Sequence, residues 1–293
     1  MRSTWSAELR DLVAGVRHRL AGRDLAAASA TLTYFSGIAV VPWLLLGVWT
    51  QTWWYGERGA TQRLGSLDVL VPPDMGGRAP YDALVTAGTG VGLLVAVVLL
   101  FPASFYGEGV RRACLAIAPQ PDAWTGWRAR LAMVVTAVVV PPLATAWFAA
   151  GEVLRPLSPE AGGGGAGDLV LRVMLGFTAT WLALAVVLTW VFRAVAPGRP
   201  RWWVAAVGGL ATGSFLAGFL QGFWLFLSIP IDVGLPFAGL GVVGGVVAVG
   251  LWLYVLHFFL LVGWTTTQTL EDRAARGPAR DGRDGRPDRE VAA

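Results

Sequence analysis

The sequence predicts an all-α fold: a polytopic membrane bundle of six transmembrane helices with both termini in the cytoplasm. Hydrophobic residues make up 55% of the 293 residues and charged residues only 14%, whereas soluble domains usually have about 45–50% and about 25%. Six apolar runs are long enough to cross a bilayer core, which requires about 20 helical residues. The arginines, finally, are concentrated in alternate connections between these runs.

The six runs contain almost no charge, apart from Arg172 near one end of the fourth run. An unpaired backbone group costs several kcal/mol in lipid, so such runs are expected to be helices. The predicted spans are 26–49, 83–106, 131–150, 169–192, 204–228 and 237–263.

Arginine placement predicts the orientation, because short cytoplasmic loops retain positive charge. All 23 basic residues are arginines. The amino-terminal segment, the loops after the second and fourth spans, and the tail hold five, four, three and six of them, while the other loops hold three, two and none. Both termini are therefore expected in the cytoplasm. A cleaved signal peptide is the competing interpretation of the basic start, but the first apolar run is too long for one.

The flanking segments differ from the transmembrane domain, residues 25–268. In residues 1–24 apolar residues recur at steps of three and four with arginines between them, which predicts an amphipathic helix. This helix could lie on the cytoplasmic leaflet or pack on the protein's own loops. Residues 269–293 are rich in Asp, Arg, Gly and Pro and are expected to form a disordered cytoplasmic tail.

The connection after the second span contains Arg111 and Arg112. Pro102 is expected to kink or end the preceding helix, which makes residues 107–118 a short separate segment. The two arginines could grip phosphate headgroups of lipids, or they could serve only to set the topology. Asp232, at the outer mouth between spans five and six, could gate or bind there, or could lie in a solvated turn.

Polar residues inside apolar spans are further candidates, because they usually face the interior of a bundle. Ser214 and Gln221 lie in the fifth span and His257 in the sixth. All three could line a lipid or substrate path. Ser214 and Gln221 could instead form hydrogen bonds between helices. His257 could relay a proton near neutral pH or be a packed, hydrogen-bonded histidine.

Glycines four residues apart predict close helix packing in the last two spans. The pairs are Gly209 with Gly213, Gly218 with Gly222, and Gly241 with Gly245. These faces could join helices within the chain or join two copies of the chain into a homo-oligomer.

Catalytic constellations are not evident in the sequence. No carboxylate pair, nucleophile with a base, or cluster of metal ligands occurs in or beside the spans, and Cys114 is the only cysteine. We therefore expect no enzymatic activity, no cofactor and no metal site.

Two spans carry the residues of a family pattern. An alanine-rich opening precedes an aromatic pair and a proline in the first span, and glycines flank a Leu-Trp-Leu-Tyr string in the last. These residues are Tyr34, Phe35, Pro42, Gly241, Gly244, Trp252, Tyr254 and Gly263. Together with the stretch from Ser104 to Cys114 around Arg111, they resemble the YihY / virulence factor BrkB family of inner-membrane proteins. The resemblance covers about residues 24–270 and includes the six-span plan.

The chain departs from that family at four positions. Ala39 stands where a serine is common, Thr265 and Thr267 stand where glutamate and asparagine are common, and His257 replaces a small residue. A cation or proton role of the family glutamate is therefore not carried over to this chain.

The resemblance implies a multi-pass protein of the bacterial inner membrane. Some members were formerly labelled ribonuclease BN, but this chain lacks the carboxylate cluster that metal-assisted phosphodiester hydrolysis needs. Others are linked to serum resistance or lipid export. Our leading hypothesis is movement, or assisted movement, of a lipid or envelope precursor between leaflets; the alternative is a non-transporting scaffold for envelope integrity. The expected partners are membrane lipids and envelope-assembly proteins, without nucleic acid.

Overall fold

The computed structural model describes residues 2–65, 78–119, 126–136, 166–227, 235–237 and 239–276, and every regular element in these ranges is helical. The elements are α1 (Arg2–Leu20), α2 (Leu25–Gly65), α3 (Arg78–Thr89), α4 (Leu93–Ile117), α6 (Ala166–Trp190), the π-helical turn η5 (Val191–Val195), α7 (Trp202–Leu227), the 3-10 turn η6 (Leu235–Phe237) and α8 (Gly241–Arg276). Residues 127–136 form a further helix.

Within the described ranges, five helices are long and apolar enough to cross a membrane: α2, α4, α6 with η5, α7 and α8. They overlap five of the six predicted spans. Of the remaining span, residues 131–136 are helical, whereas residues 137–150 lie outside the described part of the chain. The protein is thus an all-helical, multi-pass membrane protein.

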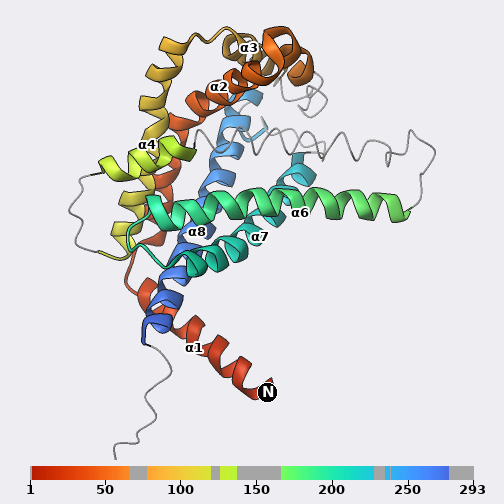
Figure 1. Cartoon of the computed structure of the whole chain (residues 1–293). Helices are drawn as coiled ribbons and strands as arrows, with labels where there is room; N and C mark the ends of the chain where they lie inside the picture. The colour runs from red at the N-terminus through yellow and green to blue at the C-terminus, as the bar shows by residue number, and fades with distance from the viewer. Residues whose placement is uncertain are drawn as a thin grey trace, which may run out of the picture.

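The long helices share one core. In Figure 1, α2, α4 and α8 run in one general direction and α6 lies across them. The side chains of Leu32, Val110, Phe192 and Trp264 belong to a single buried cluster, and they come from α2, α4, η5 and α8. By contrast, many large apolar side chains on the outer faces are exposed, such as Leu94. Exposed apolar surface of this extent suits contact with lipid tails.

The second predicted span differs from the observed helices. The helix is interrupted at residues 90–92, between α3 and α4. There Gly90 N–H donates to Thr86 O and Val91 N–H donates to Gly88 O. From Leu93 the helix runs through Pro102 to Ile117. The expectation that residues 107–118 form a separate segment is therefore wrong. Membrane helices tolerate proline within their length. One residue after Pro102, Trp43 Nε1–H of α2 donates to Ala103 O (3.1 Å), which joins α2 to α4 at this point.

α1 lies against the end of α8. α1 projects from the end of the bundle at which α8 finishes (Figure 1), and Arg19 of α1 pairs with Asp272 of α8. Arg273 Nη1–H also donates to Glu8 O (3.1 Å). α8 therefore continues to Arg276, so residues 269–276 of the expected tail are helical, and the rest of it lies outside the described residues.

Candidate functional site

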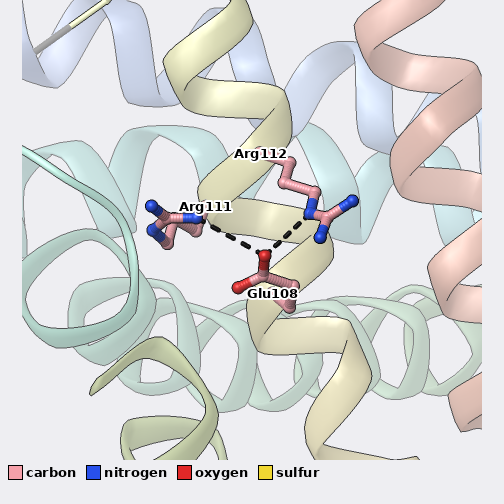
Figure 2. Close-up of polar contacts among 3 residues, drawn as sticks. All are labelled: Glu108, Arg111 and Arg112. Atoms are coloured by element: carbon pink, nitrogen blue, oxygen red, sulfur yellow. Dashed lines mark hydrogen bonds and ion pairs between the residues drawn. The ribbon is translucent and has the colours of Figure 1, made fainter. Parts of the chain in front are cut away.

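A carboxylate held between two arginines lies near the end of α4. Figure 2 shows Arg111 and Arg112 on either side of Glu108, both directed at one oxygen of its carboxylate. Arg112 Nε–H donates to Glu108 Oε1 (2.7 Å), and Arg111 Nη1–H donates to the same oxygen (3.4 Å). The spacing of three and four residues on a helix brings these side chains together.

The three side chains differ greatly in exposure. Glu108 is 7% exposed and Arg111 is 18% exposed, whereas Arg112 is 59% exposed. Among the described residues, one carboxylate accepts hydrogen bonds from two guanidinium groups. Arg112 is the more exposed of the two arginines, and its guanidinium carbon lies 5.6 Å from the ring centroid of Phe35 on α2.

The second oxygen of Glu108 faces Gly126. A Cβ on Gly126 would overlap Oε2 of Glu108, and the φ of Gly126 is +79°. Oε2 is buried and accepts no hydrogen bond within the part of the chain that the structure describes. Gly126 also begins the helix that continues to residue 136, since Arg130 N–H donates to Gly126 O (3.1 Å). A carboxylate at a helix amino terminus interacts favourably with the helix dipole.

A mainly apolar cavity of about 250 Å³ lies along the same two helices, α2 and α4. It is lined by α2, α4, the helix at 127–136, and α6 with η5, through Ser36, Ala39, Val40, Trp43, Tyr106, Met133, Thr136, Val187 and Val191. Ser36 directly follows Phe35, the ring beneath Arg112. The exposed guanidinium and the cavity therefore lie on neighbouring parts of α2 and α4.

Tyr106 connects the cavity to His257. The hydroxyl of Tyr106 lies 3.2 Å from His257 Nε2, and Thr33 Oγ1 lies 2.9 Å from His257 Nδ1. Thr33 donates its only hydroxyl proton to Ser29 O (2.9 Å), so Nδ1–H must donate to Thr33 and Nε2 must accept from Tyr106. The tautomer of His257 is thus inferred from its hydrogen-bonding partners, as is usual for histidine. Of the two interpretations of His257, a proton relay or a packed, hydrogen-bonded residue, these contacts fit the second.

The other predicted path residues do not join the cluster. Ser214 and Gln221 lie on α7 and are partly exposed. They do not line the cavity beside Tyr106, and no contact among the described residues links them to Arg111 or Arg112. The expected hydrogen bonds between helices are not formed by either side chain in the described ranges. Asp232 lies outside the described residues.

The family-pattern residues of the first span lie along α2. Tyr34 is exposed and packs edge-to-face against Phe35, with ring centroids 5.7 Å apart. Phe35 fills the space beside Gly109 on α4, where a Cβ would lie 2.5 Å from the Cβ of Phe35. Pro42 is buried inside α2. These residues therefore shape the contact between α2 and α4.

The pattern residues of the last span lie along α8. Trp252 stacks on Phe219 of α7, with ring centroids 4.2 Å apart, and Tyr254 is partly buried. Gly263 lies so close to Thr212 that a Cβ would overlap its side chain. Gly244 is buried, whereas Gly241 has open space around it.

Of the glycine pairs that predict close helix packing, only one pair packs both of its members against another described helix. A Cβ on Gly209 would lie 2.9 Å from Ala185 O, and one on Gly213 would lie 3.1 Å from Ala185 N, so this pair brings α7 against α6. In contrast, nothing lies within 4 Å of a Cβ on Gly222, Gly241 or Gly245. The latter positions remain open surface on α7 and α8.

Two polar contacts were not predicted from the sequence, one in the Glu108 cluster and one at the end of α8. Glu108 lies just beyond the second predicted span, and its spacing to Arg111 and Arg112 is the signal that could have identified it. The second feature is the end of α8, where Trp264 Nε1–H and Gln268 Nε2–H both donate to Pro197 O (3.3 Å each). No local pattern indicates that contact, because its partners are far apart in the sequence.

Comparison with known proteins identifies the family. The family model described as virulence factor BrkB matches residues 16–287. No curated protein and no solved structure matches the chain. The family match spans most of the chain and confirms the resemblance noted in the sequence, so the chain belongs to the virulence factor BrkB family.

Proposed function

We propose that this member of the virulence factor BrkB family moves, or assists the movement of, a lipid or envelope precursor between the leaflets of the bacterial inner membrane. In this proposal both termini face the cytoplasm, and the protein makes and breaks no covalent bond. The observation that carries the proposal is the exposed guanidinium of Arg112, fixed by a buried carboxylate beside an apolar cavity.

The chemistry of a lipid headgroup fits this arrangement. Guanidinium groups bind phosphate through paired, charge-assisted hydrogen bonds, and Nε of Arg112 is engaged by Glu108 while the side chain stays largely exposed. Glu108 therefore orients Arg112 without covering it. In the proposed orientation, the cluster lies at the cytoplasmic end of α4, which is where headgroups of the inner leaflet would meet it.

The adjoining cavity supplies the apolar part of the proposed path. Its lining is mainly apolar. Tyr106 lines the cavity and also contacts His257, which in turn contacts Thr33. A lipid tail or an apolar portion of a precursor could occupy this space while the headgroup contacts Arg112. The proposed path thus runs along α2 and α4 and not along Ser214 and Gln221.

A scaffold for envelope integrity is the second candidate function. The observation that favours it is the open surface at Gly222, Gly241 and Gly245, where no neighbouring atom approaches within 4 Å of a Cβ position. Small residues on exposed apolar helices permit close approach of another helix. In this alternative the faces join a second copy of the chain or an envelope-assembly protein, and Arg112 only anchors α4 at the membrane surface.

Reconstitution distinguishes the two functions. The purified full chain is placed in liposomes, and translocation of fluorescent phospholipid and polyprenyl-phosphate probes is followed by accessibility to an external quencher. Transport predicts probe movement that increases with the number of protein molecules per liposome. In the Gln221→Ala variant movement should be unchanged, because Gln221 does not line the proposed path. Protein that is folded but moves neither probe faster than empty liposomes would exclude transport and leave the scaffold.

A further inference from the structure

A second, larger cavity lies between α6 and α7, and Glu108 is not among its lining residues. Its volume is about 590 Å³, which is within the range of about 300–1,000 Å³ typical of ligand sites. The lining includes Leu182 and Trp190 of α6 and Trp202, Ala206 and Leu210 of α7. It shares Thr136 and Val187 with the cavity beside Tyr106, but Tyr106 and the residues of α2 do not line it.

The lining is suited to an apolar chain. Its threonine hydroxyls are already engaged within their own helices, because Thr189 donates to Ala185 O (2.7 Å) and Thr136 donates to Ala132 O (3.4 Å). The indole N–H of Trp190 likewise donates to Ala132 O (2.9 Å). These groups have no unpaired proton to offer a polar ligand, so the cavity is expected to exclude polar groups.

An arginine with a buried, unpaired Nε lies beside this cavity. Arg193 belongs to the π-helical turn η5, and its guanidinium carbon is 5.2 Å from the ring centroid of Trp202, which lines the cavity. Nε of Arg193 is buried and donates no hydrogen bond. No acidic side chain in the described ranges pairs with Arg193. π-helical turns within α-helices often mark functional positions.

A second arginine contacts the turn that contains Arg193. Arg128 reaches the same turn, where its Nη2–H donates to Ala194 O (3.4 Å). Glu271 of α8 is engaged by Arg201, whose Nε–H donates to it (3.0 Å). An anionic group at Arg193 would therefore satisfy a buried donor.

We propose that the space between α6 and α7 binds an amphiphile with a phosphate head, its alkyl or isoprenyl chain in the cavity and its phosphate on Arg193. The planar guanidinium of arginine favours phosphate because it can donate two parallel hydrogen bonds. Stacking on Trp202 holds the guanidinium at the rim of the cavity. Binding at this site needs no movement across the bilayer, so the inference stands or falls independently of transport.

Equilibrium binding tests the site. The full chain is purified in a sterol-based detergent, which has no linear alkyl chain to compete, and native mass spectrometry follows the binding of dodecyl phosphate. One dodecyl phosphate should bind per chain, at least about tenfold more tightly than dodecanol, a difference that corresponds to one charge-assisted interaction. Equal binding of dodecanol would overturn the role of the phosphate. Displacement of dodecyl phosphate by an equal concentration of inorganic phosphate would overturn the role of the cavity.

Variants locate the binding. Arg193→Gln should weaken dodecyl phosphate binding about tenfold or more, whereas Arg199→Gln, an exposed arginine in the connection that follows η5, should change it less than about twofold. Ala206→Phe should abolish binding by filling the cavity. If that variant does not fold by circular dichroism, Leu210→Phe replaces it. Unchanged binding in Arg193→Gln, or in a folded cavity-filling variant, would overturn the proposal.

Discussion

Glu108 is the residue on which the geometry of the α4 cluster depends. Burying a carboxylate is costly unless it is paired, and here Arg111 and Arg112 both donate to it. Gly126 makes room for the second oxygen, because any side chain at this position would overlap it. The cluster is therefore a packed contact between α4 and the helix at 127–136, and it also fixes the direction of Arg112.

Substitution of Gly126 tests that contact. Gly126→Ala should lower the free energy of unfolding by about 2–4 kcal/mol, because it adds both a strained positive φ and an overlap with Glu108. Thermal unfolding of the purified protein in detergent measures the change. Gly22→Ala is the matched control, since Gly22 also has a positive φ of +70° but nothing lies within 4 Å of a Cβ there. Equal losses in the two variants would show that Glu108 does not pack against Gly126.

At the scale of elements, helix content was predictable and helix ends were not. The apolar runs predict α2, α4 and α8 because hydrophobicity is a local property. Continuation of α4 through Pro102 could not be predicted, because a proline ends some helices and is tolerated inside others, membrane helices among them. Likewise, α8 continues to Arg276 beside α1, where Arg19 pairs with Asp272. Partners this distant leave no periodic signal in the sequence.

Glycine contacts fix how α8 packs on α7. Gly263→Ala should destabilise the protein by about 2–4 kcal/mol, because the added methyl group would overlap Thr212. Gly250→Ala, in open space on the same helix, should be neutral or stabilising by up to about 1 kcal/mol, since alanine is the better helix former. Unfolding of both variants by heat in detergent gives the comparison. A destabilisation by Gly250→Ala as large as that by Gly263→Ala would refute the predicted packing.

The hydrogen-bonded chain through His257 ties three helices together. Tyr106→Phe and Thr33→Val each remove one partner of the ring, and each should cost about 1–3 kcal/mol of stability. The double variant should cost less than the sum of the two, because both partners act on the same imidazole. A double-mutant cycle of unfolding free energies tests this coupling. Strict additivity would mean that the two hydrogen bonds are independent.

The whole molecule is a membrane protein whose candidate site was only partly visible in the sequence. Arg111 and Arg112 stood out because they follow an apolar run, and they do lie together. Ser214 and Gln221 were singled out by polarity alone, and nothing in the described structure joins them to the arginines. Which polar groups share a cavity is decided by tertiary packing, and a single sequence does not report it.

The orientation of the molecule is open to direct test. In a Cys114→Ala background, Arg58→Cys and Arg276→Cys place single thiols at exposed positions on α2 and at the end of α8. In intact cells whose outer membrane is absent or permeabilised, a membrane-impermeant maleimide should label Arg58→Cys, and it should label Arg276→Cys only after lysis. Labelling of Arg276→Cys in intact cells would place the carboxyl-terminal end of α8 outside the cytoplasm and reverse the proposed orientation.

The most direct test of lipid movement along α4 compares two arginine variants in the liposome translocation assay. Arg112→Ala should reduce the rate of probe movement at least about tenfold, because it removes the charge-assisted contact to the headgroup. Arg58→Ala removes an exposed arginine near the carboxyl-terminal end of α2, away from Phe35. It should leave the rate within about twofold of the unsubstituted protein. Equal rates for the two variants, with both proteins folded, would contradict a path through the Glu108 cluster.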